Sequence, residues 1–370
     1  MLQVQVRLPA CQYAVTIGRG LLGQTRKLLP EGLCERDLVI VTDPVVWRFH
    51  GRELLEGLGD LKAAAVLQVP SGEQAKSLGW ASKLYDGLLK AGCDRKSVVL
   101  AFGGGVVGDL AGFVAATFMR GVPLVQVPTT LLAMVDSSVG GKVAVNHPLG
   151  KNVIGAFHQP AAVIADLSTL DSLPPNQLAA GAAEAVKYGF LGDQALLDHC
   201  RSTPFGDWDL ARVVADSVRD KAAVVAQDER ETGLRRRLNL GHTLGHALEA
   251  ATRFRAYLHG EAVAVGTLYA LRLSILRGRA SEDDFETVRR LYESLGLPLA
   301  LPAVPFRRLL ELMLHDKKAH RGRLLFVLPV GLGEVEEAVG LSEETLAQAY
   351  EDLAARMGRV GVRPQKGDPR

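Results

Sequence analysis

The second half of the chain contains two histidines separated by three residues, in the run Asn239-Leu-Gly-His-Thr-Leu-Gly-His246. If this run is helical, His242 and His246 lie one turn apart on the same face. A third histidine, His259, follows at the start of another expected helix. Neutral imidazole is a common zinc ligand, so this spacing indicates a possible metal centre.

A carboxylate is available upstream on a separate expected helix, where Glu184, Lys187 and Tyr188 share one face. Two histidines and one glutamate from different elements suit Zn²⁺ and leave a coordination position open for substrate. The HExxH pattern of zinc proteases is disfavoured because Thr243, not glutamate, follows His242. The alternative is that the histidines only line a polar surface, and spacing alone does not exclude it.

A glycine-rich segment, Gly103-Gly-Gly-Val-Val-Gly-Asp109, joins an apolar strand-like run to an apolar helix-like run. Its glycines fit GxGxxG in the strand-to-helix context that favours a diphosphate at a helix N-terminus. The acidic residue expected about 20 positions later is replaced by Arg120. Asp43, at the end of an earlier strand, is the expected ribose partner instead. A tight turn that binds nothing is the other interpretation.

A second glycine turn, Pro70-Ser-Gly-Glu-Gln-Ala-Lys76, also ends a strand-like run and offers Glu73 and Lys76 to the same ligand. Further cations stand in apolar or glycine-rich surroundings, and a polar run, Thr129 to Lys142, lies within a hydrophobic domain. A single Lys or Arg side chain is usually solvated at the protein surface. Several that converge on one site would bind a small, highly anionic substrate.

Composition restricts the class of protein. The chain has 370 residues, 48% hydrophobic and 23% charged, with 43 Lys and Arg against 41 Asp and Glu. The net charge of +2 gives no reason to expect nucleic acid or membrane partners. Four cysteines lack CxxC spacing, and neither a signal peptide nor an apolar run of about 20 residues is present. We therefore expect a cytoplasmic protein.

Strand-like and helix-like segments alternate in the first half, which predicts a parallel α/β sheet after an opening hairpin at residues 3–8 and 13–17. Strands are expected at 37–42, 63–69, 97–102 and 124–127, with a helix at 76–90 whose buried face carries Leu78, Leu84 and Leu88. The second half predicts helices at 178–190, 210–227, 244–251, 261–276 and 283–294, and one extended run at 323–328. We expect domains at 1–172 and 173–355, with a loose tail at 356–370.

Taken together, these motifs resemble the 3-dehydroquinate synthase family, a group of sugar phosphate cyclases. The segments that carry the resemblance run in consistent order: 70–77, 103–113, 126–142, 146–160, 184–189, 238–247 and 258–261. The resemblance implies an α/β nucleotide-binding domain, an all-α metal-binding domain and an active site in the cleft between them. It also implies a homodimer.

The resemblance assigns roles residue by residue. It implies NAD contacts from Asp43, Glu73, Lys76, Gly104, Gly105, Val106, Asp109, Thr129, Thr130, Lys142 and Lys151. It implies that Glu184, His242 and His259 hold Zn²⁺ or Co²⁺. Catalytic and substrate contacts carry over to Arg120, Asp136, Lys142, Lys151, Asn152, Lys187, Lys221, Arg235, Asn239, His246 and one of Lys317 or Lys318.

The implied reaction converts 3-deoxy-D-arabino-heptulosonate 7-phosphate to 3-dehydroquinate and phosphate. It proceeds by transient oxidation by NAD, phosphate elimination, re-reduction and aldol closure. Three alternatives remain: another sugar phosphate cyclase, a metal-dependent polyol or glycerol-phosphate dehydrogenase, and a non-catalytic nucleotide-binding regulator. The chain departs from the family pattern at Pro175-Asn176-Gln177, and the tail beyond Arg356 has no recognised counterpart.

Overall fold

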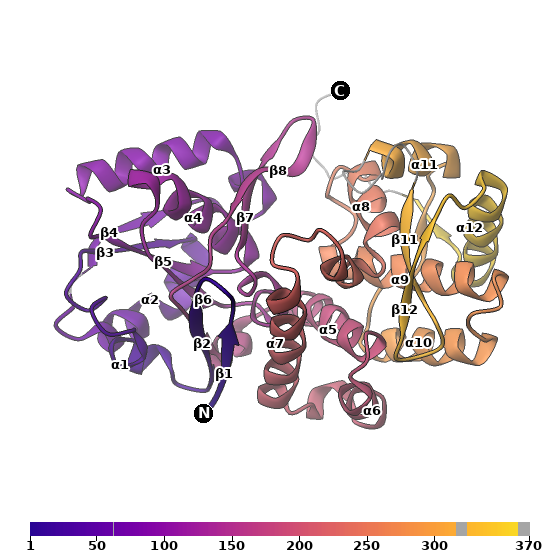
Figure 1. Ribbon diagram of the computed structural model, residues 1–370, viewed down its shortest axis with the longest axis horizontal. Helices are drawn as coiled ribbons and strands as arrows, with labels where there is room; N and C mark the ends of the chain where they lie inside the picture. The colour runs from indigo at the N-terminus through magenta and orange to yellow at the C-terminus, as the bar shows by residue number, and fades with distance from the viewer. Residues whose placement is uncertain (62, 316–323, 362–370) are drawn as a thin grey trace. The chain divides into compact units, whose positions relative to one another are not determined.

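The computed structural model describes residues 1–61, 63–315 and 324–361 (Figure 1). The chain divides into two compact units. Unit 1 comprises Met1–Gly181 and Asp209–Thr232, and unit 2 comprises Ala182–Trp208 and Gly233–Arg370. The chain therefore leaves unit 1, returns to it and leaves it again.

Unit 1 is built on a seven-stranded sheet of order β1-β2-β9-β6-β5-β3-β4. Its strands, with the separate β7–β8 hairpin, are β1 (Leu2–Arg7), β2 (Gln12–Gly18), β3 (Leu38–Thr42), β4 (Ala63–Gln68), β5 (Val98–Gly103), β6 (Leu124–Pro128), β7 (Lys142–His147), β8 (Gly150–Phe157) and β9 (Ala162–Asp166). Its helices are α1 (Thr25–Leu28), α2 (Pro44–Leu58), α3 (Leu78–Lys90), α4 (Gly105–Thr117), α7 (Leu210–Gln227) and the first part of α5 (Pro175–Phe190). Apart from the antiparallel β1–β2 pair, neighbouring strands in this sheet are parallel.

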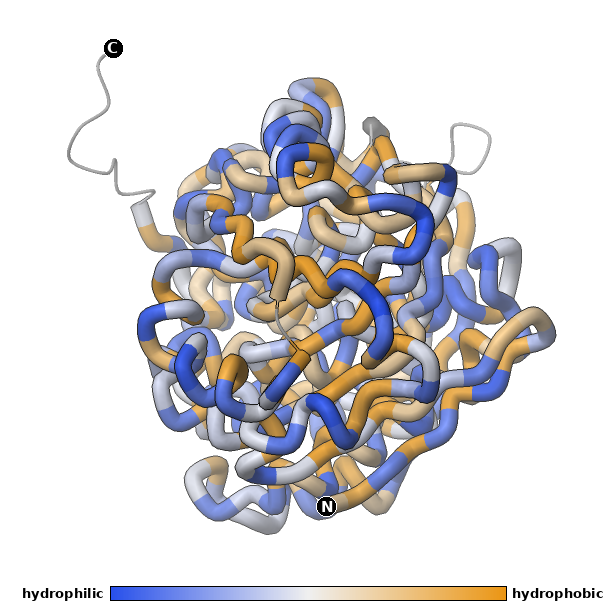
Figure 2. Tube along the Cα trace, turned by 90° about the vertical axis from the view of Figure 1, so that its left-hand side faces the viewer, coloured by the Kyte–Doolittle hydropathy of each residue, from blue (hydrophilic) through white to orange (hydrophobic). Residues whose placement is uncertain are grey.

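Both faces of this sheet are covered, which explains the continuous apolar runs of its central strands. Val39 and Val41 of β3 belong to the core beneath α3 and α4. Leu38 and Ile40, which alternate with them, belong to the opposite core with Leu54 of α2. Figure 2 shows apolar and polar segments alternating along the trace.

The register of the parallel strands brings their carboxyl ends to one edge. Thr42 pairs with Phe102, and Gly103 pairs with Pro128. The N–H of Thr129 donates to the carbonyl of Gly103 at 3.0 Å. Open α/β sheets bind ligands at this edge, so the residues following β3, β5 and β6 are positioned for that role.

Unit 2 is mainly helical. After the second part of α5 it contains α6 (Gln194–Ser202), α8 (His242–Ala251), α9 (His259–Leu276), α10 (Glu282–Ser294), α11 (Phe306–His315) and α12 (Glu343–Met357). It also contains two small sheets, a parallel pair β10 (Leu301–Pro302) and β13 (Arg359–Val360) and an antiparallel pair β11 (Leu325–Pro329) and β12 (Val335–Val339).

Glycines allow α8 and α9 to cross closely. A Cβ placed on Gly266 would lie 1.9 Å from the carbonyl oxygen of Gly241, and one on Gly245 would lie 3.1 Å from that of Ala262. The first turns of these two helices carry His242 and His259. The close crossing thus helps to fix the relative positions of the two imidazoles.

Most of the predicted elements are confirmed, including the opening hairpin and the four strands that alternate with helices. Leu78 is a correction: it is 47% exposed at the start of α3, while Leu84 and Leu88 are buried as expected. The expected all-α second domain also contains the two small sheets, because short runs such as Val335–Val339 pair locally.

The predicted loose tail is wrong for its first residues, because α12 continues to Met357 and β13 pairs with β10. Residues 362–370 lie outside the described residues. The single boundary at 172–173 stays a prediction, and it did not anticipate that Asp209–Thr232 returns to unit 1. Within the described residues, no helix combines the length and apolarity needed to cross a bilayer.

Candidate active site

Glu184 and two histidines gather within unit 2. The Glu184 side chain is fully buried on α5, and its Oε1 lies 3.8 Å from Nε2 of His242 and 3.8 Å from Nε2 of His259. This oxygen has no hydrogen-bond partner among the described residues. Ligands about 2.0–2.2 Å from a tetrahedral zinc ion lie roughly 3.3–3.6 Å apart. Both oxygen–nitrogen distances are therefore close to those between two ligands of a zinc or cobalt ion.

The other nitrogen of each imidazole is already occupied. His242 Nδ1 lies 3.0 Å from the carbonyl oxygen of Leu240, and His259 Nδ1 lies 3.0 Å from Oε2 of Glu249. Both partners accept hydrogen bonds, so Nδ1 carries the proton in each ring and Nε2 is left as the metal ligand. Carboxylate or carbonyl partners of this kind orient metal-binding histidines.

The second oxygen of Glu184 forms an ion pair with Lys187, one turn later on α5. Both side chains are buried, and the Lys187 ammonium lies 5.7 Å from the ring centroid of Tyr188. The ion pair holds Oε2, which turns Oε1 toward the two histidines. The predicted shared helix face thus brings Lys187 into contact with both Glu184 and Tyr188.

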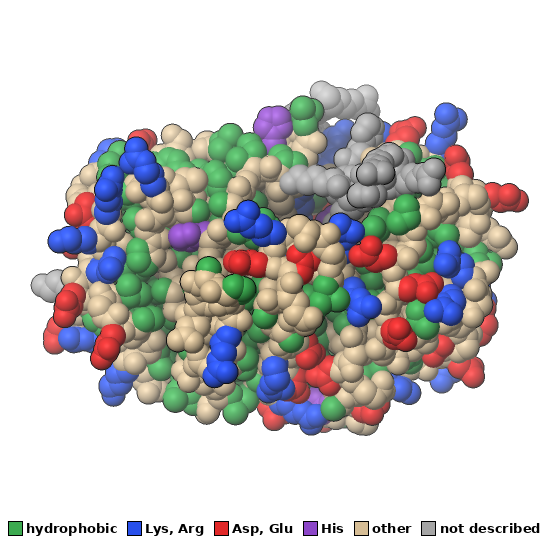
Figure 3. Space-filling view, in the orientation of Figure 1, with side chains coloured by type: hydrophobic (Ala, Val, Ile, Leu, Met, Phe, Trp, Pro, Cys, Tyr) green, Lys and Arg blue, Asp and Glu red, His purple; other side chains and the backbone are tan. Residues whose placement is uncertain are grey.

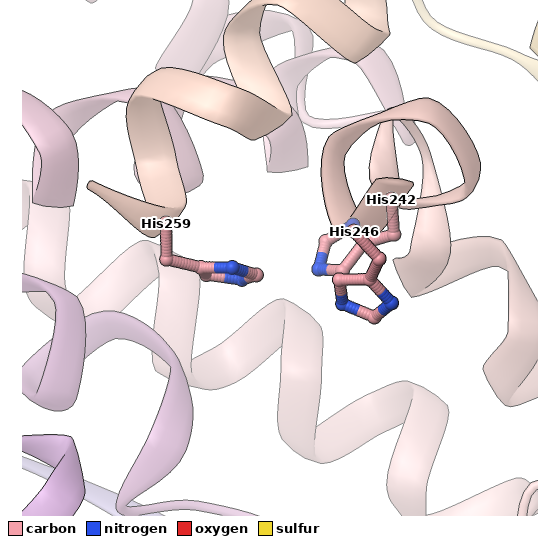
Figure 4. A group of neighbouring side chains, drawn as sticks. All are labelled: His242, His246 and His259. Carbon is pink, nitrogen blue, oxygen red and sulfur yellow. The ribbon is translucent and has the colours of Figure 1, made fainter. Parts of the chain in front are cut away.

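His246 lies beside this centre (Figure 4). Its ring centroid is 5.4 Å from that of His242 and 5.8 Å from that of His259. One nitrogen from each of the three rings falls within 4.8 Å of the others, so three histidines form a second possible ligand set. The closer approach of buried Glu184 Oε1 favours the set with glutamate and leaves His246 as a neighbouring group.

The glycine-rich loop has the predicted strand-to-helix geometry in unit 1. Gly104 is the N-cap of α4, and no side chain caps the first turn of that helix. A Cβ on Gly104 would lie 3.0 Å from Cγ2 of Thr130, and one on Gly105 would lie 2.9 Å from Oγ of Ser137. The hydroxyl of Thr129 is buried and has no hydrogen-bond partner among the described residues. The uncapped backbone N–H groups at the start of α4 and the Thr129 hydroxyl suit a diphosphate group.

Charged residues surround the second glycine turn. Lys76 forms an ion pair with Asp109, and Lys151 Nζ lies 3.8 Å from Oε1 of Glu73. Burial raises the pKa of Asp109, and the Lys76 ammonium opposes that rise. Four predicted cofactor residues from three segments of unit 1 therefore come together.

Asp43 has a structural role in addition to its predicted one. Its Oδ1 accepts hydrogen bonds from the backbone N–H groups of Val45 and Val46 and from the hydroxyl of Ser71. It thus caps α2 and holds the second glycine turn. The proposed ribose contact would fall to the other carboxylate oxygen.

Two predicted substrate lysines are held by carboxylates in unit 1. Lys142 Nζ lies 2.5 Å from Glu231, and Lys221 Nζ donates to the backbone and side-chain oxygens of Asp136 at 2.7 Å. Asp136 stands in a π-helical turn, Ala133–Ser137. These contacts place Lys221, from α7, next to the polar run after β6.

Arg120 lies in unit 1 on a short 3-10 turn that follows α4. It has a left-handed backbone with φ of 69°, follows Met119 at 49°, and lines a cavity of about 420 Å³ together with Cys11, His158 and Gln159. Among the predicted site residues that the structure describes, Arg120 alone lines that cavity. Lys187, Arg235, Asn239 and His246 belong to unit 2, and Arg235 is buried there. Lys317 and Lys318 lie outside the described residues.

Sequence reasoning missed Glu249, Glu231 and Asn146. Glu249 follows His246 by three positions on the same helix, so its spacing offered a signal. Glu231 is one of three acidic residues in Asp228-Glu-Arg-Glu231, and no pattern distinguishes it from its neighbours. Asn146 was quoted only as the first residue of a longer motif.

Two family descriptions match the chain, and they meet close to the first break between the two units. The family description 3-dehydroquinate synthase N-terminal matches residues 66–180, and 3-dehydroquinate synthase C-terminal matches residues 181–319. The chain belongs to the 3-dehydroquinate synthase family. The enzyme class expected from the sequence is thereby confirmed.

A 3-dehydroquinate synthase of Desulforamulus reducens is 46% identical over 340 residues, which cover 90% of this chain and 95% of the relative. A 2-epi-5-epi-valiolone synthase of Streptomyces hygroscopicus, solved with NAD⁺ and Zn²⁺, is 25% identical with a TM-score of 0.85. A 2-deoxy-scyllo-inosose synthase complexed with carbaglucose-6-phosphate, NAD⁺ and Co²⁺ is 24% identical with a TM-score of 0.84 and shares the fold. Each structural match covers 95% of this chain and 99% of the other. Sequence identity favours the dehydroquinate branch over these other cyclases.

Proposed function

We propose that this enzyme converts 3-deoxy-D-arabino-heptulosonate 7-phosphate to 3-dehydroquinate and phosphate, with NAD and Zn²⁺ or Co²⁺ as cofactors. The observation that carries the proposal is the buried, unpartnered Oε1 of Glu184, 3.8 Å from a nitrogen of each of two histidines. A buried carboxylate oxygen needs a partner, and a divalent cation between these three atoms supplies one.

Each group of residues has a defined part in the proposal. When bound, NAD supplies a hydride acceptor and the metal supplies Lewis acidity toward substrate oxygens. Lys187, Glu249 and the Leu240 carbonyl orient the three ligands. His246, beside them, handles the proton or the phosphate. The uncapped start of α4 and the Thr129 hydroxyl bind the cofactor.

The cations bind the phosphate and carboxylate of the substrate. Lys142 and Lys221 are each held by a carboxylate, which fixes the position of the ammonium before substrate arrives. Acidic and basic side chains are mixed over the face seen in Figure 3, in keeping with the net charge of +2. Attraction for an anionic substrate is therefore local, not a property of the whole surface.

The test is phosphate release from the heptulosonate phosphate with catalytic NAD⁺, before and after chelation and metal restoration. Release without net NADH, lost on chelation and restored by Zn²⁺ or Co²⁺, is expected. Net NADH formation would instead identify a dehydrogenase. A metal-loaded protein that binds NAD but releases no phosphate would contradict the choice of substrate.

A homodimer and a cytoplasmic location complete the proposal. Light scattering after gel filtration tests the first, and fractionation of cells tests the second. A monomer across micromolar concentrations would contradict the dimer.

A further inference from the structure

Asn146, on β7, forms hydrogen bonds to two segments that carry proposed ligand contacts. Its Nδ2 donates to Oε1 of Glu73 at 2.8 Å, and its Oδ1 accepts from the backbone N–H of Asn152 at 3.0 Å. Its own N–H donates to the carbonyl of Lys76 at 2.8 Å. All of these residues lie in unit 1.

The contact with Asn152 spans an irregularity in the β7–β8 hairpin. Val145 pairs with Ile154 and His147 pairs with Gly150, so residues 151–153 stand opposite Asn146 alone. Asn152 has a left-handed backbone with φ of 55°, and its N–H has left the ladder. The Asn146 side chain replaces the missing ladder acceptor and holds this bulge, which displays Lys151 and Asn152.

The contacts on the other side fix the second glycine turn. Glu73 Oε1 is shared between the Asn146 amide and the Lys151 ammonium, which is 3.8 Å away. The backbone of Asn146 also forms a parallel bridge with Ser77, just after the turn. The turn and the bulge are therefore tied to each other through one half-buried amide.

We propose that Asn146 is a positioning residue. It holds the cofactor-binding turn at Glu73 and the substrate-binding bulge at Lys151 and Asn152 in fixed positions relative to each other. The proposal rests on the function proposed above. It deepens that function by assigning a role to a residue that acts on both binding segments without itself contacting NAD or substrate. Because the amide donates to one segment and accepts from the other, its two contacts can be removed separately.

Two variants separate the contacts. Asn146→Ala removes both, and it should raise the Kd for NAD and the KM for the heptulosonate phosphate by roughly fivefold to tenfold each. Asn146→Asp keeps an acceptor for Asn152 but sets a carboxylate against Glu73. It should raise the Kd for NAD by about tenfold or more while the substrate KM changes less than about threefold. No change in either constant for Asn146→Ala would overturn the proposal.

A stricter test restores the hydrogen bond between positions 73 and 146 with donor and acceptor exchanged. In Glu73→Gln/Asn146→Asp, the Gln amide can donate to the new carboxylate. If the two variants acted independently, their losses of NAD-binding free energy would add. The double variant should bind NAD at least about fivefold more tightly than this sum predicts. Strict additivity would show that the Glu73 contact does not position the turn.

A readout without turnover separates this proposal from the function itself. Hydrogen exchange should show loss of protection at the Asn152 amide in Asn146→Ala and retention in Asn146→Asp. Gln5→Glu, at an exposed position of β1, is the amide-to-carboxylate control. If the wild type releases no phosphate, the proposed function fails, while NAD binding and amide exchange still decide the role of Asn146. If the wild type is active but Asn146→Ala retains Asn152 protection, the inference alone fails.

Discussion

Thr129 Oγ1 and Glu184 Oε1 are buried oxygens with no hydrogen-bond partner among the described residues. Folded proteins satisfy most buried polar groups, so such atoms often mark places where a ligand completes the structure. Thr129 lies at the carboxyl edge of the sheet, and Glu184 lies between two histidines. Each can be tested by removing the atom or its support.

Thr129→Val replaces a hydroxyl by a methyl group of similar size. We expect NAD affinity to fall about tenfold while the unfolding free energy stays the same or rises, because an unsatisfied buried hydroxyl is removed. Calorimetric NAD titration and urea unfolding measure the two effects. Thr25→Val is the matched control, since its buried hydroxyl donates to the Leu22 carbonyl. It should lose about 1 kcal/mol of stability and keep its NAD affinity.

Glu249→Gln weakens the partner of His259 Nδ1 without changing its size. We expect zinc affinity to fall roughly 10–100-fold, because the carboxylate orients the ring and raises the basicity of Nε2. Competition with a chromophoric chelator measures this directly. Glu293→Gln, an exposed glutamate that pairs with Arg289 in the same unit, serves as control. Unchanged zinc affinity in Glu249→Gln would contradict this role.

At the scale of elements, the crossing of α8 and α9 determines whether the histidines meet. Gly266→Ala would place a Cβ 1.9 Å from the carbonyl oxygen of Gly241, and the three nearest atoms are all backbone atoms of Gly241 and Gly245, which leaves little room for adjustment. We expect a loss of at least about 2 kcal/mol in unfolding free energy, with weaker zinc binding. Gly206→Ala, where nothing lies within 4 Å of the new atom, should leave both unchanged within error. A stable Gly266→Ala protein with normal zinc affinity would contradict the argument.

The elements show how much of this architecture was predictable. Strands such as Leu38–Thr42 were predictable because burial on both faces demands a continuous apolar run between helices. Glu184, His242 and His259 were predicted as ligands, and the geometry brings them together.

The bulge opposite Asn146 was not predictable, because it depends on a register shift between two strands. The spacing of Glu249 from His246 indicates a shared helix face, but the contact of Glu249 with His259 also requires the relative placement of two helices, which that spacing does not encode.

Two histidines of unit 1 make the stability of the whole molecule depend on pH. Burial lowers the pKa of His50 and of His158 below the usual 6.5. For His158, the hydrogen bond to the Val122 carbonyl raises the pKa and so opposes this effect in part. Below pH 6.5 the unfolded chain takes up protons that the folded protein resists. Stability should therefore fall as pH drops from about 7.5 to 5.5, by at most about 1.4 kcal/mol per pH unit for each histidine.

Urea unfolding of the wild type and of His50→Gln/His158→Gln at several pH values measures this dependence. The double variant should lose a distinct part of the slope in that window. An identical slope in the two proteins would show that other groups cause it.

The return of Asp209–Thr232 to unit 1 matters for how the chain is made. Valines of α7, among them Val213, Val214 and Val218, are buried in unit 1, where α7 packs on β1 and β2. During synthesis, the first unit cannot close when residue 181 leaves the ribosome, because α7 has not yet emerged. Its earliest strands must wait with an uncovered apolar face until residue 232 has emerged, by which time part of the second unit has already been made.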